Sequence, residues 1–225
     1  MITRSTRKHS GRRLPSDQRR LDIVQAVLEL AGERGPDAIT TQAIAERIGV
    51  TQGALFRHFP DKEAIWLAVF EWVREALGAA LDAAVAQAQS PLAKLERAFV
   101  AHVTFVAAHP GVPKALFHEL QYPADSRVRM AVRAMVGGYR TRLAALFDEA
   151  KAAGELPPSL DAALAAVLFI GAVQGLVIDA TLRQGAAPVA RAARHMFALL
   201  LDGWRGVPST REASRTSRAA PRATR

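Results

Sequence analysis

Residues 40–59 read TTQAIAERIGVTQGALFRHF, and this stretch decides the fold. A helix-turn-helix needs a small residue where its two helices cross, a residue with positive φ in the turn, and apolar residues that lock the helices together. Ala45 is the small residue, Gly49 adopts a positive φ without strain, and Thr51 is placed to cap the second helix. The apolar positions are spaced for packing on a preceding helix; they are Ile44, Ile48, Val50 and Leu55. The stretch therefore predicts a helix-turn-helix.

The rest of the chain has the composition and punctuation of an all-α protein. Ala, Leu, Glu, Arg and Gln dominate it, and alternating β-branched runs are missing. Proline and glycine fall mainly between periodic segments, where they end one helix and precede the next. Nine helices are predicted, over residues 16–34, 40–48, 51–59, 61–88, 91–108, 112–121, 124–153, 159–184 and 188–204.

The formal charge of +9 lies in the two ends of the chain. Residues 1–20 carry +6 and residues 205–225 carry +5, so residues 21–204 carry −2. Two Arg-rich ends beside a near-neutral body indicate a polyanionic partner, either nucleic acid or an anionic membrane surface. The alternative is that both ends are disordered and merely solvated.

Several residue types and motifs are absent, and each absence excludes a class of protein. The chain has no Cys, which excludes disulfides, thiolate metal sites and cysteine nucleophiles and favours a reducing cytoplasm. Its basic first 20 residues lack the apolar stretch of a signal peptide, so we expect a cytoplasmic protein. The sequence has no G-x-S-x-G, phosphate-binding glycine loop or H-E-x-x-H, and we expect neither an enzyme nor a bound cofactor.

The longest uncharged apolar run covers residues 162–178 and includes Gln174. A membrane-spanning helix needs about 20 apolar residues. This run is 17 residues long, so we expect a buried helix and no membrane partner. The histidines in the middle of the chain, among them His102 and His118, lack the spacing of a ligand set, and we expect no metal site.

The residues after the helix-turn-helix make the pattern specific. Residues 56–66 read FRHFPDKEAIW, and residues 16–66 closely resemble the DNA-binding domain of the TetR family of bacterial transcriptional regulators. The positions that carry the resemblance are Gly35, Thr40, Thr41, Gly49, Val50, Thr51, Gly53, Leu55, Phe56, His58, Phe59, Lys62, Glu63 and Ile65. The resemblance implies an all-α, nine-helix TetR-like fold. An N-terminal three-helix DNA-binding domain would precede a C-terminal helical domain for ligand binding and dimerisation.

On this basis we expect the chain to have four parts. A disordered basic arm over residues 1–15 precedes the DNA-binding domain over residues 16–61. The ligand-binding and dimerisation domain covers residues 62–204, and a disordered basic tail covers residues 205–225. The DNA-binding domain itself is not basic, so we expect the arm to lie along phosphate or in the minor groove. The tail either adds non-specific DNA affinity or is inert.

The resemblance implies contacts with double-stranded operator DNA at Thr40, Thr41, Thr51, Gln52, Gly53, Ala54, Phe56, Arg57, His58 and Lys62. By position, Thr41 and Thr51 bond phosphate, and His58 and Lys62 contact the DNA backbone. Gly53 lets the second helix of the motif approach the groove closely.

The remaining positions bear on sequence readout. Gln52, Ala54 and Arg57 occupy variable positions that reach bases or nearby phosphate. A Gln side chain pairs bidentately with adenine and an Arg side chain with guanine, and each pair discriminates by about 1–3 kcal/mol. Phe56 stands where the family often has Tyr, so we expect it to keep the packing and to lose a hydroxyl bond to phosphate.

A single helix-turn-helix makes few contacts, so proteins of this kind usually dimerise on a palindrome. The last two predicted helices are the candidates, and the resemblance implies the same. Gly171 and Gly175 lie four apart on one helix face and permit close approach of another helix. With Phe197 and Leu200 they are the predicted homodimer interface. The alternative is that the apolar helix belongs to the core of one protomer.

The fifth to eighth helices should hold a pocket for a small hydrophobic effector, by the same resemblance. A mainly apolar cavity with a few polar groups is the usual small-molecule site. The predicted lining residues are Phe99, His102, Val103, Phe117, His118, Tyr122, Met135, Tyr139, Phe169 and Gln174. The alternative for each of them is an ordinary core position.

These features together predict a DNA-binding transcriptional regulator. We expect a ligand-responsive repressor that binds a palindromic operator as a homodimer, in the cytoplasm and on the nucleoid when DNA-bound. The alternative is a DNA-bound architectural or cell-division factor on the same fold, controlled by a protein partner. A ligand-sized pocket favours the first, and a packed core with an exposed apolar patch favours the second.

Overall fold

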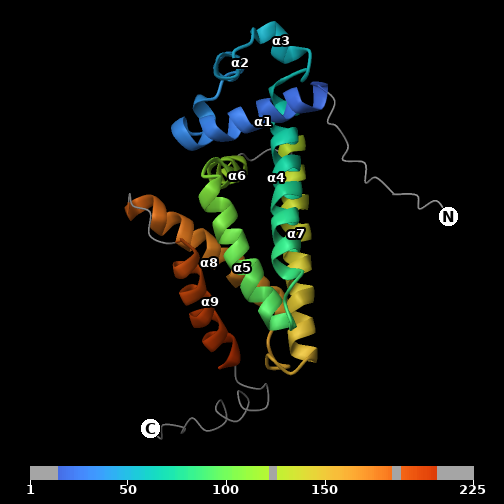
Figure 1. Cartoon of the computed structure of the whole chain (residues 1–225), viewed down its shortest axis with the longest axis vertical. Helices are drawn as coiled ribbons and strands as arrows, with labels where there is room; N and C mark the ends of the chain where they lie inside the picture. Colours follow the sequence, from blue (N-terminus) through green and yellow to red (C-terminus); the bar gives the residue numbers. More distant parts are fainter. Residues whose placement is uncertain (1–14, 122–125, 184–188, 207–225) are drawn as a thin grey trace, which may run out of the picture.

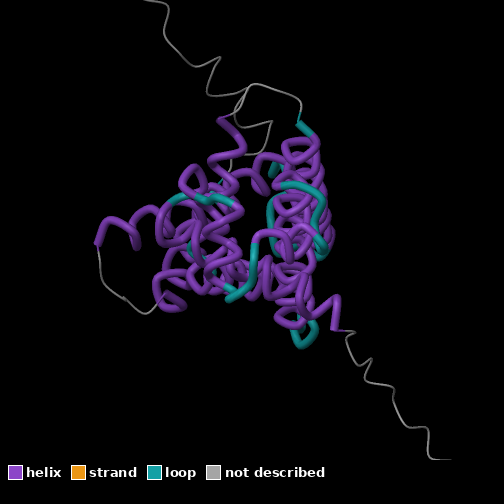
Figure 2. The backbone as a smooth tube through the Cα atoms, turned by 90° about the horizontal axis from the view of Figure 1, so that it is seen from above, coloured by secondary structure: helices purple, strands orange, loops and turns teal. Residues whose placement is uncertain are grey.

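The structure is a computed structural model that describes residues 15–121, 126–183 and 189–206. Over these residues the chain forms nine α-helices and one short 3-10 turn, with no strand (Figure 1, Figure 2). The elements are α1 (Pro15–Arg34), η1 (Pro36–Ala38), α2 (Thr41–Arg47), α3 (Gln52–Phe56), α4 (Lys62–Val85), α5 (Pro91–Ala108), α6 (Gly111–Gln121), α7 (Arg127–Ala152), α8 (Ala162–Arg183) and α9 (Val189–Arg205). The all-α, nine-helix prediction is confirmed for these ranges.

Side-chain caps fix where several of the helices begin. Thr40, Thr51 and Asp61 accept hydrogen bonds from the backbone N–H three residues on, over 3.0, 3.2 and 2.7 Å respectively. Helix α1 begins at Pro15, one residue before the predicted start. The turn η1 was not predicted.

Figure 1 shows how the helices are arranged along the molecule. Helices α2 and α3 form one end, and α1 lies across the molecule beneath them. Helix α4 runs away from α1 beside α5 and α7, and α8 and α9 pack on the other side of α5.

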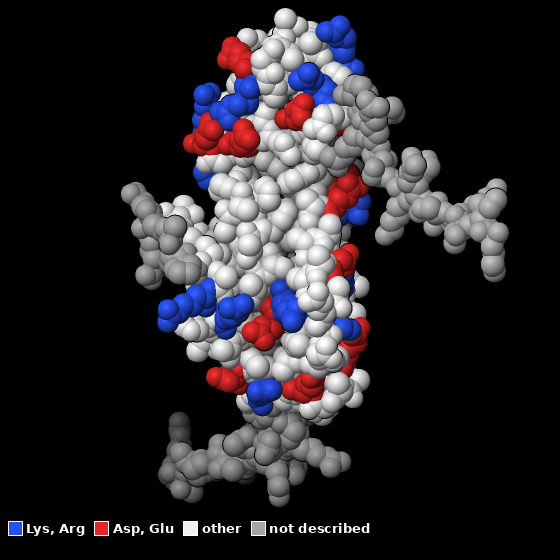
Figure 3. Space-filling view, viewed as in Figure 1, with Lys and Arg blue, Asp and Glu red and all other residues white. Residues whose placement is uncertain are grey.

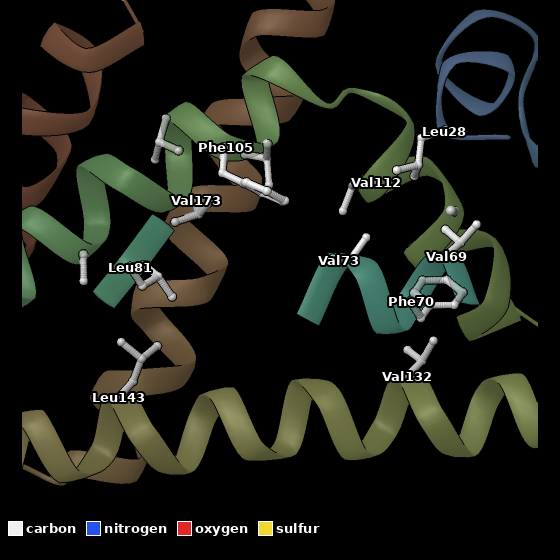
Figure 4. Close-up of a cluster of buried hydrophobic side chains, with 14 of the residues drawn as sticks. Leu28, Val69, Phe70, Val73, Leu81, Phe105, Val112, Val132, Leu143 and Val173 are labelled. Carbon is white, nitrogen blue, oxygen red and sulfur yellow. The ribbon is translucent and has the colours of Figure 1, made fainter. Parts of the chain in front are cut away.

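One apolar core extends from the helix-turn-helix end into the bundle. Figure 4 shows Phe70 and Val73 of α4 between Val132 of α7 and Val112 of α6, with Leu28 of α1 nearby. Because α1 contributes to this core, the position of the helix-turn-helix depends on how α1 packs against the bundle.

Aromatic rings fill the lower part of the core. The ring of Phe99 lies edge-on to that of Phe169, with centroids 4.9 Å apart, and 5.8 Å from that of Phe197. Trp204 closes the cluster against Phe147, at 4.8 Å. These contacts join α5, α7, α8 and α9 into one packed unit.

Helix α6 meets α1 through direct backbone contact. Gly111 lies so close to α1 that a Cβ atom there would overlap the Leu28 carbonyl oxygen and lie 3.0 Å from the Gly32 nitrogen. Lys114 of α6 also donates a hydrogen bond to the Gly32 carbonyl, near the end of α1. Glycine at position 111 is therefore required for this approach.

A buried polar pair joins α5 to α7. The Tyr139 hydroxyl and His102 Nδ1 share a hydrogen bond of 3.0 Å, and the two rings meet edge to face. Burial lowers the pKa of His102 to about 4 and raises the pKa of Tyr139 above its usual value. The imidazole is therefore neutral in the folded protein at pH 7.

Helix α8 differs from its prediction, because it is not buried all round. Its apolar stretch Ala162–Leu182 has a mean hydropathy of 2.1 and is long enough to cross a membrane by length and composition. Helix α8 packs on α5 and α7, but Leu164 is 66% exposed and Leu182 is 77% exposed. One face of α8 is therefore both apolar and uncovered in a single chain.

The contact between α1 and α6 predicts a large effect for one added methyl group. Gly111→Ala should lower the free energy of unfolding by about 1–3 kcal/mol, because the backbones must move apart. Gly78→Ala is the matched control: it lies within α4, and a Cβ there meets nothing within 4 Å. The control should stabilise by up to about 1 kcal/mol, since alanine is the better helix former. Urea unfolding curves that place both variants on the same side of wild type would contradict the contact.

The buried imidazole predicts a loss of stability in acid. The unfolded side chain takes up a proton near pH 6.5 and the folded one only near pH 4, so protonation favours the unfolded state. Stability should be complete above pH 6.5 and fall by up to about 3 kcal/mol between pH 6.5 and 4 through this group.

Unfolding curves measured across that range test the assignment. In His102→Gln the free energy of unfolding should fall less steeply between pH 6.5 and 4 than in wild type. Tyr139→Phe should keep the wild-type slope, because burial rather than the hydrogen bond lowers the pKa. An unchanged slope in His102→Gln would show that other groups cause the acid sensitivity.

Candidate functional site

The helix-turn-helix has the geometry that the sequence predicts. Gly49 has a φ of 69° in the turn, and the Val50 N–H donates to the Ala45 carbonyl over 2.9 Å. Ile44 and Leu55 are buried, so α2 and α3 are locked by their inner faces. The roles expected of these residues in the turn and the packing are confirmed.

An ion-pair network fastens α2 to α1. Arg47 of α2 donates to Glu29 over 3.1 Å and to Glu33 over 2.5 Å. These bonds hold the pKa of Glu33 below its usual value and raise the pKa of Arg47. The positive charge of Arg47 is thus used within the domain rather than offered to a partner.

A second arginine packs on the other end of the motif. Arg20 donates to the His58 carbonyl over 2.6 Å, and its guanidinium lies 4.1 Å from the centroid of the Phe59 ring. The sequence analysis counts Arg20 only among the charges of residues 1–20, whereas in the structure it lies on α1 and supports the end of α3. The arm residues before Pro15 lie outside the described residues.

The predicted DNA-contacting residues lie on the first turns of α2 and α4 and along α3. The exposed ones are Thr40, Thr51, Gln52, Gly53, Phe56, Arg57 and Lys62, and the half-buried ones are Thr41, Ala54 and His58. Leu55 and Phe59 face the core instead. Helix α3 thus has one packed face and one open face, at the end of the molecule (Figure 1).

Two residues of the open face, Gly53 and Phe56, present surface to solvent. A Cβ at Gly53 would meet nothing within 4 Å, so the chain does not need glycine there to fold. Phe56 is 41% exposed, so part of its ring is covered and part is open to solvent. Both residues are therefore available to a partner.

The charge of this end is mixed rather than uniformly basic. Figure 3 shows Lys and Arg next to Asp and Glu over the helix-turn-helix end, and few charged residues in the middle of the same face. The described part of the domain thus agrees with the near-neutral charge of the body.

A groove opens between α5, α6, the end of α8 and the start of α9, with a volume of about 530 Å³. Its walls are mostly apolar, including Val103 of α5, Phe117 of α6 and Ala192 of α9. Lys114 and Asp179 are the charged residues in its lining. A mainly apolar groove with few charges suits a small amphipathic molecule.

Two of the residues predicted for the effector pocket line this groove, and most of the others lie elsewhere in the structure. Val103 and Phe117 line the groove, whereas Phe99, His102, Tyr139 and Phe169 are held in the core contacts described above. Met135 packs half-buried against the core, His118 lies 3.4 Å from Asp37, and Gln174 has a buried Oε1 without a hydrogen-bond partner in the described residues. Tyr122 lies outside the described residues. Apolar spacing alone does not separate core from groove.

Helix α6 connects the groove to the DNA-binding end. Its Lys114 lines the groove and donates to the Gly32 carbonyl of α1. Glu119 on the same helix is buried, and burial raises the pKa of its carboxyl although the nearby positive charge of Lys62 acts against this rise. Helix α6 therefore lines the groove and also contacts α1.

A continuous apolar seam runs along the exposed face of α8. It consists of Leu164, Leu168, Gly171, Gly175, Ile178 and Leu182, which are all exposed and alternate between spacings of four and three residues. This is the spacing of a seam between two packed helices. A Cβ at Gly171 or Gly175 would meet nothing within 4 Å, so both glycines open outward, as predicted.

The α9 part of the predicted interface needs a correction. Phe197 is 3% exposed and packs on Phe99 and Trp204, inside the protomer. Leu200 is half-buried, and Leu199 is the large apolar residue of this helix that is exposed, at 68%.

Among the described residues there is no group of three or more His, Asp and Glu arranged to hold a metal ion.

Two family models of bacterial regulators match this chain. Residues 23–69 match the family model for bacterial regulatory proteins of the tetR family, and residues 122–196 match that for the tetracyclin repressor-like C-terminal domain. The nucleoid occlusion factor SlmA of Marinomonas sp. (strain MWYL1) is 27% identical over 162 residues, which cover 72% of this chain and 82% of that protein.

Solved structures share the fold. The regulator FadR from Bacillus subtilis, in complex with stearoyl-CoA, superposes with a TM-score of 0.68 at 21% identity, over 81% of this chain and 98% of that one. AibR, in complex with isovaleryl coenzyme A and operator DNA, gives a TM-score of 0.69 at 21% identity, over 81% and 98%. The two family matches and the helix-turn-helix geometry lead to one conclusion: the chain belongs to the TetR family and is a DNA-binding transcriptional regulator.

Proposed function

We propose that the protein is a ligand-responsive repressor that binds a palindromic operator as a homodimer. The open face of α3 carries the proposal, because Gln52, Gly53 and Arg57 stay exposed while the opposite face is locked into the core. A face of this kind enters the major groove and reads base edges. Such a regulator acts in the cytoplasm, on the nucleoid when bound to DNA.

The occupant of the α8 seam in this proposal is a second copy of the chain. Two antiparallel or parallel copies of α8 bury each other's apolar stripe, and the two glycines allow close approach. Leu199 of α9 extends the apolar surface beside the seam. A two-fold dimer places two recognition helices on one duplex, which requires two half-sites at a fixed spacing.

The ligand in this proposal is a small amphipathic molecule with an acyl-like chain. The groove offers apolar walls for the chain of the ligand. The ammonium of Lys114 attracts an anionic group, and the carboxylate of Asp179 repels an anionic group that lies at its end of the groove. FadR and AibR, which share the fold, were solved with acyl-coenzyme A molecules. This supports an acyl-coenzyme A as the first candidate to test.

The coupling in this proposal runs through α6. A ligand in the groove touches the same helix that contacts α1 at Gly111 and Gly32. The ligand changes operator affinity only as far as it binds one arrangement of α6 and α1 more tightly than the other.

A second candidate function is that of a DNA-bound cell-division factor controlled by a protein partner. The similarity to SlmA, a nucleoid occlusion factor, favours it, and so does the exposed apolar surface. The two functions differ in what releases the protein from DNA, a small molecule in the groove or a protein.

Selection from a random duplex library at about 150 mM salt tests the DNA-binding part, because non-specific phosphate contacts weaken as salt rises. We expect a palindrome with a fixed half-site spacing. Gly53→Ala should keep its thermal stability, since the added methyl meets nothing in the fold, and should lose roughly tenfold or more in operator affinity. Salt-sensitive binding without enrichment, or full affinity in Gly53→Ala, would contradict the assignment of α3 as the reader.

Fluorescence anisotropy on the selected operator tests the ligand. Stearoyl-CoA or isovaleryl-CoA should release wild-type protein, and Ala192→Phe, which fills the groove, should raise the required concentration about tenfold. Ala190→Phe is the matched control on the exposed side of the same helix and should respond as wild type. Equal responses of the two variants would remove the groove from the mechanism, and no release by either thioester would favour the second function.

A further inference from the structure

A hydrogen bond joins the first residues of α2 and α3. The Gln52 Nε2 donates to the Thr41 Oγ1 over 2.6 Å. Gln52 is exposed and lies on the open face of α3, whereas Thr41 is half-buried. The two residues are eleven apart in sequence, so the bond depends on the fold of the whole motif.

This bond restricts what the Gln52 amide can offer to DNA. A Gln side chain has two N–H donors on Nε2 and one acceptor, Oε1. One N–H is used by Thr41, and the described residues provide no further partner for Gln52. One N–H donor on Nε2 and the acceptor Oε1 are left for a base edge.

The remaining pair matches one base. In the major groove adenine presents the N7 acceptor beside the N6 amino donor, whereas guanine presents two acceptors, N7 and O6. A Gln with both N–H groups free can point them at the two guanine acceptors. When one N–H is bonded to Thr41, the Oε1 acceptor instead faces the guanine O6 acceptor, and the two oxygens repel each other. We infer that Thr41 is a positioning residue that holds Gln52 for adenine and against guanine in each half-site.

This inference changes the role that the sequence assigns to Thr41. The family resemblance makes it a phosphate contact, and its hydroxyl proton stays available for that, because Oγ1 accepts from Gln52. A pre-ordered side chain also loses less conformational entropy on binding than a freely rotating one. Thr41 thus acts on base preference and not only on overall affinity.

The inference rests on the proposed DNA-binding function, and the test separates the two. Five proteins are used. They are wild type, Thr41→Val, which removes only the hydroxyl at nearly constant shape, Thr41→Ser, which keeps it, Gln52→Ala, and the double variant that combines Thr41→Val with Gln52→Ala. Thr40 rather than Thr41 caps α2, so Thr41→Val should fold as wild type, which its thermal unfolding curve checks. Each protein is measured against the selected operator and against the same operator with the Gln52-dependent A·T pair changed to G·C.

Wild type and Thr41→Ser should bind the adenine operator roughly tenfold or more tightly than the guanine one. In Thr41→Val and Gln52→Ala this ratio should fall to about threefold or less, and the double variant should show no further fall. A Thr41→Val protein that weakens on both operators by one common factor would overturn the inference and leave only a phosphate contact. A selected operator in which no position depends on Gln52 would overturn it as well. Wild-type protein that selects no sequence at all would overturn the proposed function with it.

Discussion

The packing of α1 determines how the other parts of the molecule act on one another. This helix carries Glu29 and Glu33, which bind α2 through Arg47, and Arg20, which supports the end of α3. It also meets α6 backbone to backbone at Gly111, where no side chain larger than hydrogen fits. If the two domains were joined only by a loose linker, a small displacement of a helix in one would not move the other. Here close packing leaves little room for such a shift to be absorbed.

The local features of the DNA-binding end were readable from the sequence because they depend on neighbours in the chain. The turn glycine at 49, the cap at Thr51 and the buried Leu55 all follow from spacing within one or two turns of helix. Contacts across longer separations were not readable in this way. The stacking of Arg20 on Phe59 joins residues on two helices, and the sequence pattern marks Arg20 only as one basic residue among several.

The C-terminal part was predicted less well for a physical reason. Helices there have apolar residues on more than one face, so periodicity shows that a residue is apolar but not what covers it. Phe197 and Leu199 are two residues apart and point to different sides of α9, one into the core and one to solvent. Phe99 and Phe169 were assigned to a pocket for the same reason, although each fills the core against the other. The groove instead lies where the ends of α6, α8 and α9 come together, which depends on helix crossing and length.

The two glycines in the middle of the α8 seam have a consequence for which chains can pair. In the proposed dimer they leave a notch between Leu168 and Ile178, and a facing helix must present a shape that enters it. A related chain with bulky residues at both corresponding positions cannot approach to the same distance, so its stripe and this one leave voids when mixed. In the proposed dimer the notch thus favours pairing between identical chains over pairing with a relative that lacks it.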